Sequence, residues 1–207
     1  MNLRSLLGEL SKDRMTIGVV SDTHGYFDPC LHEMLAGVDA ILHGGDVGSP
    51  EILDELRRIA PVYAVRGNVD SPESKLPLTL TLSFAWLQVE VMHILPVPQS
   101  DLEEWAGLAD RASPKGKAPQ RGERFLKTLN ESTGAVVFGH SHVPCLEPLG
   151  GILFFNPGSA GKKRFSLART CGLLEVFPDH LQATIKPLER YNRKLPARIR
   201  LEFERKE

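Results

Sequence analysis

The sequence contains few cysteines and few aromatic residues. Its 3 cysteines, Cys30, Cys145 and Cys171, are widely spaced among 207 residues and form no CxxC pair. An odd, scattered set of this kind does not indicate a disulfide framework. Because the N-terminus also lacks a signal-peptide pattern, a reducing compartment is favoured, and we expect the protein in the cytoplasm.

Neither sign of charge is in excess, and no long apolar run is present. There are 25 Lys plus Arg against 26 Asp plus Glu, so the net charge of −1 gives no general attraction to nucleic acid or to an anionic membrane. No apolar stretch approaches the roughly 18 residues of a membrane-spanning helix. A nuclease would need a basic groove lined with aromatic rings, whereas Trp86 and Trp105 are isolated. Neither a membrane nor a nucleic acid is therefore an expected partner.

The composition, 42% apolar and 25% charged, is typical of one globular domain with small additions. Leucines recur on one helical face within residues 1–14, which predicts an accessory helix before the domain. The domain itself is expected at residues 15–185, with a proline-containing surface insertion at about 96–122 that holds one helical turn. A charged tail is expected at residues 186–207.

The first part of the domain alternates short β-branched runs with amphipathic stretches. This alternation predicts a parallel sheet with right-handed crossover helices, and hence an α/β fold. The expected elements are strands at residues 16–20, 40–42 and 62–65 and helices at residues 29–35 and 50–59.

After Asp70 the pattern changes to strict alternation of apolar and polar residues. Strands with one solvated face alternate in this way, so a second sheet is expected to begin here. The alternating strands are expected at residues 78–82 and 86–92. A helix at residues 123–131 and further strands at 135–138, 152–155, 172–177 and 181–185 are also expected.

Polar residues follow each of the first three expected strands. The chain reads DTH at residues 22–24, GGD at 44–46 and GN at 67–68. Because the carboxyl ends of neighbouring parallel strands lie side by side, we expect Asp22, Asp46 and Asn68 to converge. Their oxygens would form one ligand cluster.

Two later strands end in histidine. His93 follows one of them, and the sequence GHSH follows the other, with His140 and His142. Oxygen and imidazole donors without thiolate suit Mn best, and Fe, Zn or Ni also, rather than Ca or a structural zinc ion. Seven donors exceed the needs of one catalytic ion, so two divalent ions that share the Asp46 carboxylate are expected.

Each motif alone has an ordinary structural explanation. A GGD sequence is most often a turn, and a single strand histidine is more often a hydrogen-bonded core residue than a ligand. Several polar groups at one edge of a buried sheet are harder to explain structurally, because each is costly to bury. His43 is expected to be structural, Asn156 and Ser159 to shape a nearby loop, and residues 162–164 to form a solvated basic face.

The ordered set DTH, GGD, GN, a single histidine and GHSH resembles the calcineurin-like metallophosphoesterase superfamily over residues 15–185. The sequence NPGS at residues 156–159 resembles its small bacterial and archaeal phosphodiesterase branch, which is similar to the small scaffold subunit of the retromer. The resemblance implies a four-layer α/β/β/α sandwich of two mixed sheets, with a dinuclear metal site at the carboxyl ends of the strands.

The resemblance also implies roles for individual residues. A bridging water or hydroxide would attack phosphorus, and Asp46, Asn68 and His140 would be catalytic. The first ion would be held by Asp22, His24, Asp46 and His142, and the second by Asp46, Asn68, His93 and His140.

Two positions depart from the superfamily pattern. Many members carry a histidine after the Gly-Asn pair, where this chain has Val69, so a general acid typically worth roughly 10²–10⁴-fold is absent. His93 is followed by Ile94 rather than glycine, which leaves its interpretation as an ordinary strand histidine open.

The function implied is a metal-dependent phosphodiesterase that acts on small phosphodiesters, with a bias toward aryl esters. The alternatives are a protein-interaction scaffold with little activity and a phosphomonoesterase. A homo-oligomer is compatible with the sequence.

Overall fold

The computed structural model describes residues 14–84, 86–106, 124–164, 166–189 and 198–202. The accessory helix expected at residues 1–14 and most of the expected insertion lie outside this part of the chain. Within it, the order of strands and helices agrees with an α/β fold.

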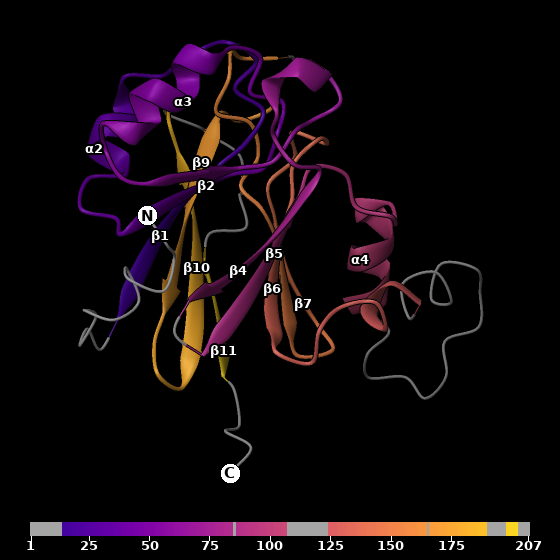
Figure 1. Cartoon of the computed structure of the whole chain (residues 1–207). Coiled ribbons are helices and arrows are strands. Elements are labelled where there is room, and N and C mark those ends of the chain that lie inside the picture. The colour runs from indigo at the N-terminus through magenta and orange to yellow at the C-terminus, as the bar shows by residue number, and fades with distance from the viewer. Residues whose placement is uncertain (1–13, 85, 107–123, 165, 190–197, 203–207) are drawn as a thin grey trace.

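The described strands form two mixed sheets that face each other (Figure 1). The first has the order β11-β10-β9-β1-β2-β3, in which β1, β2 and β3 are parallel and the other three are antiparallel to their neighbours. Its strands are β1 (Met15–Val20), β2 (Ala40–His43), β3 (Val62–Ala64), β9 (Thr170–Val176), β10 (His180–Pro187) and β11 (Arg198–Glu202).

The second sheet has the order β4-β5-β6-β8-β7. Strands β5, β6 and β8 are parallel, and an antiparallel strand flanks them on each side. Its strands are β4 (Thr79–Phe84), β5 (Leu87–Met92), β6 (Thr133–Val137), β7 (Cys145–Leu149) and β8 (Ile152–Asn156).

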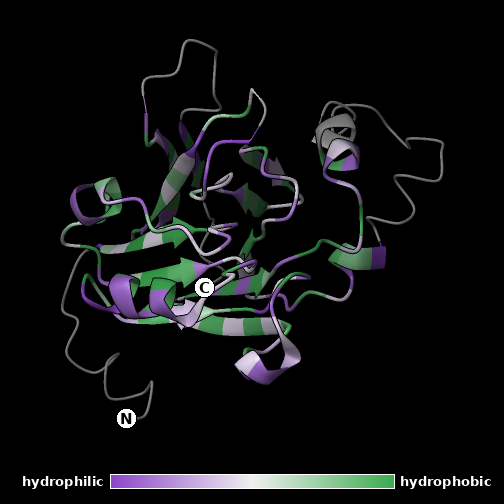
Figure 2. Ribbon diagram, turned by 90° about the horizontal axis from the view of Figure 1, so that it is seen from above, coloured by the Kyte–Doolittle hydropathy of each residue, from purple (hydrophilic) through white to green (hydrophobic). Residues whose placement is uncertain are grey.

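The main core lies between the sheets. On β5 every second residue points inward, so Leu87, Val89 and Val91 are fully buried there while the residues between them are partly exposed. Strand β6 is buried on both faces because a helix layer covers its outer side. Figure 2 shows hydrophobic residues concentrated along the strands and hydrophilic ones on the helices and loops outside them.

Helices cover the outer face of each sheet, which completes four layers. Helices α2 (Cys30–Met34) and α3 (Pro50–Arg57) pack on the first sheet through a second apolar cluster that includes Leu31 and Leu56. Helix α4 (Gln99–Ala106) packs on the second sheet, with Leu102 fully buried in a third cluster (Figure 1). The four-layer sandwich is therefore confirmed.

The structure adds two strands that the sequence analysis missed, and both are edge strands. Strand β7 contains Glu147 and Pro148 and shows no alternation. Strand β11 lies within the segment expected to be a charged tail, and it pairs antiparallel with β10. The helical turn expected within the insertion is present as helix α4, which begins at Gln99. Of the helix expected at residues 123–131, the described part is helical only at 124–126.

Candidate metal centre

Five loops meet at the carboxyl ends of the parallel strands of both sheets. Three follow β1, β2 and β3 of the first sheet, and two follow β5 and β6 of the second. Together they carry all seven donors expected from the sequence, namely Asp22, His24, Asp46, Asn68, His93, His140 and His142. The structure brings these side chains together in two adjoining groups.

The first group consists of Asp22, His24 and His142. The Nε2 atoms of the two histidines lie 3.1 Å apart, and His142 Nε2 lies 3.2 Å from Asp22 Oδ1. Asp22 is fully buried, and its carboxylate accepts hydrogen bonds from Ser21 Oγ (2.7 Å) and the backbone N–H of His140 (3.1 Å). One carboxylate oxygen and two imidazole nitrogens thus face a common point.

The second group consists of Asp46, Asn68, His93 and His140. Asn68 Oδ1 lies 3.0 Å from His93 Nε2 and 2.9 Å from His140 Nδ1. His93 Nε2 also lies 3.3 Å from Asp46 Oδ1, and its Nδ1 lies 2.7 Å from the backbone oxygen of Gly44. A hydrogen bond to a carbonyl fixes the tautomer of His93 so that Nε2 is directed toward the group.

Asp46 adjoins both groups. Its Oδ1 faces His93, while its Oδ2 lies 3.8 Å from His24 Nε2. Burial by itself would raise the pKa of Asp46, but hydrogen bonds from His93 and the Val69 backbone N–H outweigh burial and lower it to about 2. The carboxylate is therefore ionised at neutral pH with one oxygen toward each group.

The two histidines beside Asp46 have pKa shifts in opposite directions. For His24, burial and then the positive charge of Arg164 lower the pKa, which keeps a free lone pair on the ring. For His93, burial would lower the pKa, but the hydrogen bond to Asp46 outweighs it and raises the value. A cation bound beside Asp46 would compete with protons for the His93 ring, so metal affinity would depend on pH.

The backbone at the centre is strained. In the described part of the chain 6 non-glycine residues have positive φ, between 47° and 70°, and only Lys75 lies outside the centre. The other five are Asp22, His24, Asp46, His140 and His142. Left-handed backbone costs roughly 1–2 kcal/mol per residue and persists where the surrounding structure holds it, most often at functional sites.

Glycines allow the loops to approach one another closely. A Cβ atom on Gly67 would overlap the backbone and carboxylate of Asp46, and one on Gly45 would lie 2.7 Å from His93 Nδ1. The glycine of the GN loop therefore lets that loop pack against Asp46, and a glycine of the GGD loop lets that loop pack against His93.

Several residues that hold the loops were not assigned a role in the sequence analysis. Asp70 accepts hydrogen bonds from the backbone N–H groups of Gly67 (2.8 Å), Val47 (3.1 Å) and Gly48 (2.8 Å), which joins two loops. Its position two residues after Asn68 was the only available signal.

Gln99 comes from the insertion and reaches the GHSH loop. Its side chain accepts a hydrogen bond from Ser141 Oγ (2.6 Å) and donates one to the backbone oxygen of Val143 (3.2 Å). A single glutamine in a segment without periodicity carries no sequence signal for this role.

Three residues expected to support the centre do so. His43 is fully buried, and both of its ring nitrogens are taken up by hydrogen bonds with Thr23 Oγ1 (3.0 Å) and the backbone N–H of Gly45 (3.2 Å). Ser159 Oγ donates to the backbone oxygen of Asp22 (2.8 Å), and Asn156 Nδ2 donates to that of Gly139 (2.9 Å).

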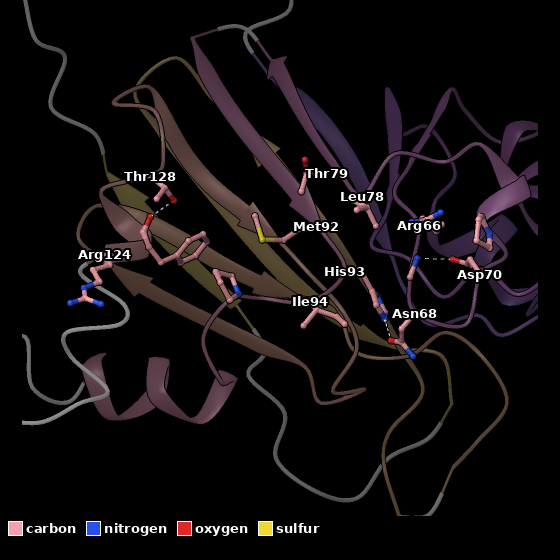
Figure 3. A pocket seen from close by; sticks show the side chains of 14 residues that line it. Arg66, Asn68, Asp70, Leu78, Thr79, Met92, His93, Ile94, Arg124 and Thr128 are labelled. Carbon is pink, nitrogen blue, oxygen red and sulfur yellow. Dashed lines mark hydrogen bonds between the residues drawn. The ribbon is translucent and has the colours of Figure 1, made fainter.

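A groove of about 850 Å³ opens beside the second group, and Asn68 and His93 form part of its wall. Figure 3 shows these two residues at one end and Arg124 and Thr128 at the other. The remaining wall is mainly apolar and includes Leu78, Met92, Ile94 and Phe125. The centre is thus open to a ligand much larger than an ion.

The donor set fits divalent cations. Two triads of side chains each place one ligand atom per residue within 4.8 Å of the other two. They are Asp22 with His24 and His142, and Asp22 with Asp46 and His93. Carboxylates and the neutral imidazole of His24 have lone pairs directed at the shared space, and imidazole and carboxylate donors suit transition metals.

The sequence profile of the calcineurin-like phosphoesterase superfamily domain matches residues 15–178. The chain belongs to this superfamily. Membership makes it a metallophosphoesterase by family, and the matched region contains every donor of both groups.

Relatives agree with this placement. A probable metallophosphoesterase of Methanocaldococcus jannaschii is 32% identical over 183 residues, which are 84% of this chain and 82% of that protein. The phosphodiesterase YfcE of Escherichia coli K12 is 28% identical over 144 residues, which are 66% of this chain and 68% of that protein. The crystal structure of Vps29 from Entamoeba histolytica complexed with Zn²⁺ has the same fold, with a TM-score of 0.63, 22% identity and coverage of 92% of this chain and 100% of that one.

The helices of the described residues are too short or too polar for any of them to traverse a bilayer.

Proposed function

We propose that this metallophosphoesterase hydrolyses small phosphodiesters with two divalent cations held by the seven donors of the metal centre. The observation that carries the proposal is the position of Asp46, whose two oxygens face His24 and His93 in different groups. A carboxylate placed in this way is suited to bridge two cations. The similarity to a named phosphodiesterase over two thirds of the chain supports the diester assignment.

Mn²⁺ is the proposed cation, and Fe, Zn or Ni would suit the same mixture of carboxylate, amide and imidazole donors. The Zn²⁺ complex of the E. histolytica protein supports a transition metal in this fold. Three cysteines without a disulfide among the described residues support a cytoplasmic setting, where thiols stay reduced.

Two adjacent divalent cations would polarise phosphoryl oxygens and lower the pKa of water so that it attacks at neutral pH. The chain's own contribution is to position the donors. Asn68 and His140 lie at the open edge of the centre, where both are exposed, and would face the phosphoryl group. In the reaction the water oxygen bonds to phosphorus, the bond from phosphorus to the leaving oxygen breaks, and that oxygen takes a proton.

Val69 affects the last step. Its side chain is exposed beside Asn68 and has no proton to give, so the leaving oxygen departs as an anion or takes a proton from solvent. We therefore expect aryl diesters, whose phenolates are stable anions, to be hydrolysed much faster than alkyl diesters.

A scaffold that has kept only the fold is the second candidate. Exposed aliphatic side chains at Val69, Ile94 and Val143, each directly after a proposed ligand, support a contact surface around the centre. All seven donors are present and lie close to one another, which supports the enzyme more strongly. Binding a protein partner would not require histidine loops with strained backbone.

The proposal is tested by hydrolysis of bis(4-nitrophenyl) phosphate with added Mn²⁺. We expect Asp46→Asn to lower kcat/KM by about 100-fold or more, because even an outer-shell partner of a metal site is worth roughly 10–100-fold. The matched control is Asp54→Asn, which removes an exposed carboxylate from helix α3 and should leave the rate unchanged. Equal rates for wild type and Asp46→Asn would reject catalysis at this centre, and faster hydrolysis of 4-nitrophenyl phosphate would favour a phosphomonoesterase.

A further inference from the structure

The groove beside the second group is continuous with the metal centre, because Asn68 and His93 belong to both. A phosphodiester held at the centre would therefore extend one of its two ester groups into the groove. The volume of about 850 Å³ lies within the range of small-molecule sites.

The exposed part of the groove wall includes two large aliphatic side chains. Leu78 is 62% exposed and Ile94 is 50% exposed, and among the apolar side chains described only Val69 has a comparable value. Met92 extends the same wall toward Arg124 (Figure 3), and Phe125 also lines it. Apolar surface gathered in a concave site gains free energy when a ligand removes it from water.

Two arginines accompany this apolar surface: Arg66, which is half-buried, and Arg124, which is exposed at the other end. Arg66 lines the groove, is half-buried, and forms no side-chain hydrogen bond or ion pair with the residues that the structure describes. A half-buried guanidinium without a carboxylate is suited to pair with an anion from outside. The groove thus combines the half-buried Arg66 guanidinium with a wall for an apolar group.

We infer that the groove is the subsite for an aryl-sized apolar ester group of the substrate, so that the preferred substrate class is aryl phosphodiesters rather than small alkyl ones. This inference rests on the proposed function. An aryl phosphodiester carries one negative charge next to an apolar ring, and this single chemistry accounts for Arg66 and for the exposed wall at Leu78 and Ile94.

The test is a binding measurement with two anions of equal charge. Calorimetric titration of the Mn²⁺-loaded protein with diphenyl phosphate and with dimethyl phosphate should give about tenfold tighter binding of the diphenyl ester, as expected when roughly 60 Å² of ring surface leaves water. Each ester is recovered and checked for hydrolysis after the titration, so that the ratio reports binding rather than turnover.

Matched variants test whether the preference for the diphenyl ester arises in the groove. Ile94→Gln and Val143→Gln each replace an exposed aliphatic residue that directly follows a proposed ligand histidine, but only Ile94 lines the groove. The ratio of the two dissociation constants should fall at least about threefold in Ile94→Gln and in Leu78→Gln, and it should not change in Val143→Gln. Arg66→Gln should weaken both anions equally and leave the ratio unchanged.

Metal content and hydrolysis of bis(4-nitrophenyl) phosphate are measured on the same preparations. Equal affinity for the two esters, or an equal loss of preference in Val143→Gln, would overturn the subsite even in a protein that binds metal and hydrolyses diesters. Absence of both bound metal and hydrolysis would instead overturn the proposed function, and the subsite with it.

Discussion

Asp46 illustrates how single residues of the centre are prepared for a cation. Burial alone would make its carboxyl less acidic, yet contacts with His93 and the Val69 N–H lower its pKa to about 2. His24 remains neutral because burial and the charge of Arg164 oppose its protonation. The side chains thus offer ionised oxygens and free imidazole lone pairs before any ion is bound.

His43 provides a pH-dependent prediction at the same scale. Thr23 Oγ1 donates to the backbone oxygen of Val47, so His43 Nε2 donates to Thr23 while Nδ1 accepts from Gly45. A second proton would have no acceptor, and burial lowers the pKa of His43 from 6.5 to about 4. Folding therefore favours the neutral ring, and its stabilisation is complete above pH 6.5 and is lost as the pH falls toward 4.

We expect the metal-free protein to lose up to roughly 3 kcal/mol of unfolding free energy across this window on account of His43. Urea unfolding at stepped pH in the presence of EDTA measures the loss. The variant His43→Gln should be less stable at pH 7 and should show a flatter dependence between pH 6.5 and 4. An identical pH dependence in both proteins would contradict the assignment.

At the scale of elements, the centre is a set of loops packed directly on one another. The GN loop lies against Asp46 with no room for a side chain at Gly67, and Asp70 ties it to the loop after β2. Each loop therefore determines the position of a donor in its neighbour.

The substitution Gly67→Ala should displace Asp46 and weaken Mn²⁺ binding by about tenfold or more, since its Cβ meets backbone atoms that cannot move independently. Calorimetric titration with Mn²⁺ measures the effect. Gly37→Ala is the matched control, because Gly37 has positive φ but a methyl group there would meet no atom of another loop or element within 4 Å. The Gly37→Ala variant should lose only about 1 kcal/mol of stability and should bind Mn²⁺ as tightly as wild type. A similar loss of Mn²⁺ affinity in Gly67→Ala and Gly37→Ala would refute direct loop packing.

At the scale of the whole molecule, the centre connects the two sheets. Asp22, His24, Asp46 and Asn68 follow strands of the first sheet, while His93, His140 and His142 follow strands of the second. Cations bound among them would join the two halves of the sandwich at one edge, beyond the apolar core between the sheets.

Metal should accordingly stabilise the fold. At a free Mn²⁺ concentration of about 100 times the dissociation constant, we expect the unfolding free energy to rise by about 2.7 kcal/mol and Tm by roughly 5–10 °C relative to protein in EDTA. Differential scanning calorimetry measures the change. The Asp46→Asn variant should show a smaller increase, and a Tm independent of Mn²⁺ would argue against a cation between the sheets.

Much of the fold was predictable because its strands carry strong local patterns. The alternation on β5 and the continuous apolar run of β6 reflect one and two buried faces, respectively. Strand β7 was missed because Glu147 and Pro148 interrupt its apolar residues, and strand β11 was missed because its residues are only alternately exposed and partly exposed. The charged character of Arg198 and Arg200 therefore resembles a tail, although Ile199 and Leu201 pack on the core.

The convergence of these carboxylates and histidines was also predictable, because polar side chains at successive strand ends of a buried sheet lie side by side. Their supporting contacts were not. Gln99 reaches Ser141 across 42 residues of chain, and no periodicity encodes a contact of that range.

By itself the sequence determined the donor types, the strand that each follows and the lack of a protonating side chain at Val69, since these depend on residue identity and local periodicity. Only the tertiary structure decided that the edges of two separate sheets meet, so that His93 and His142 lie within reach of Asp46 and Asp22, and that an apolar groove adjoins them. The physical reason is that the packing of one sheet on another is set by many long-range apolar contacts, whose geometry no single segment contains.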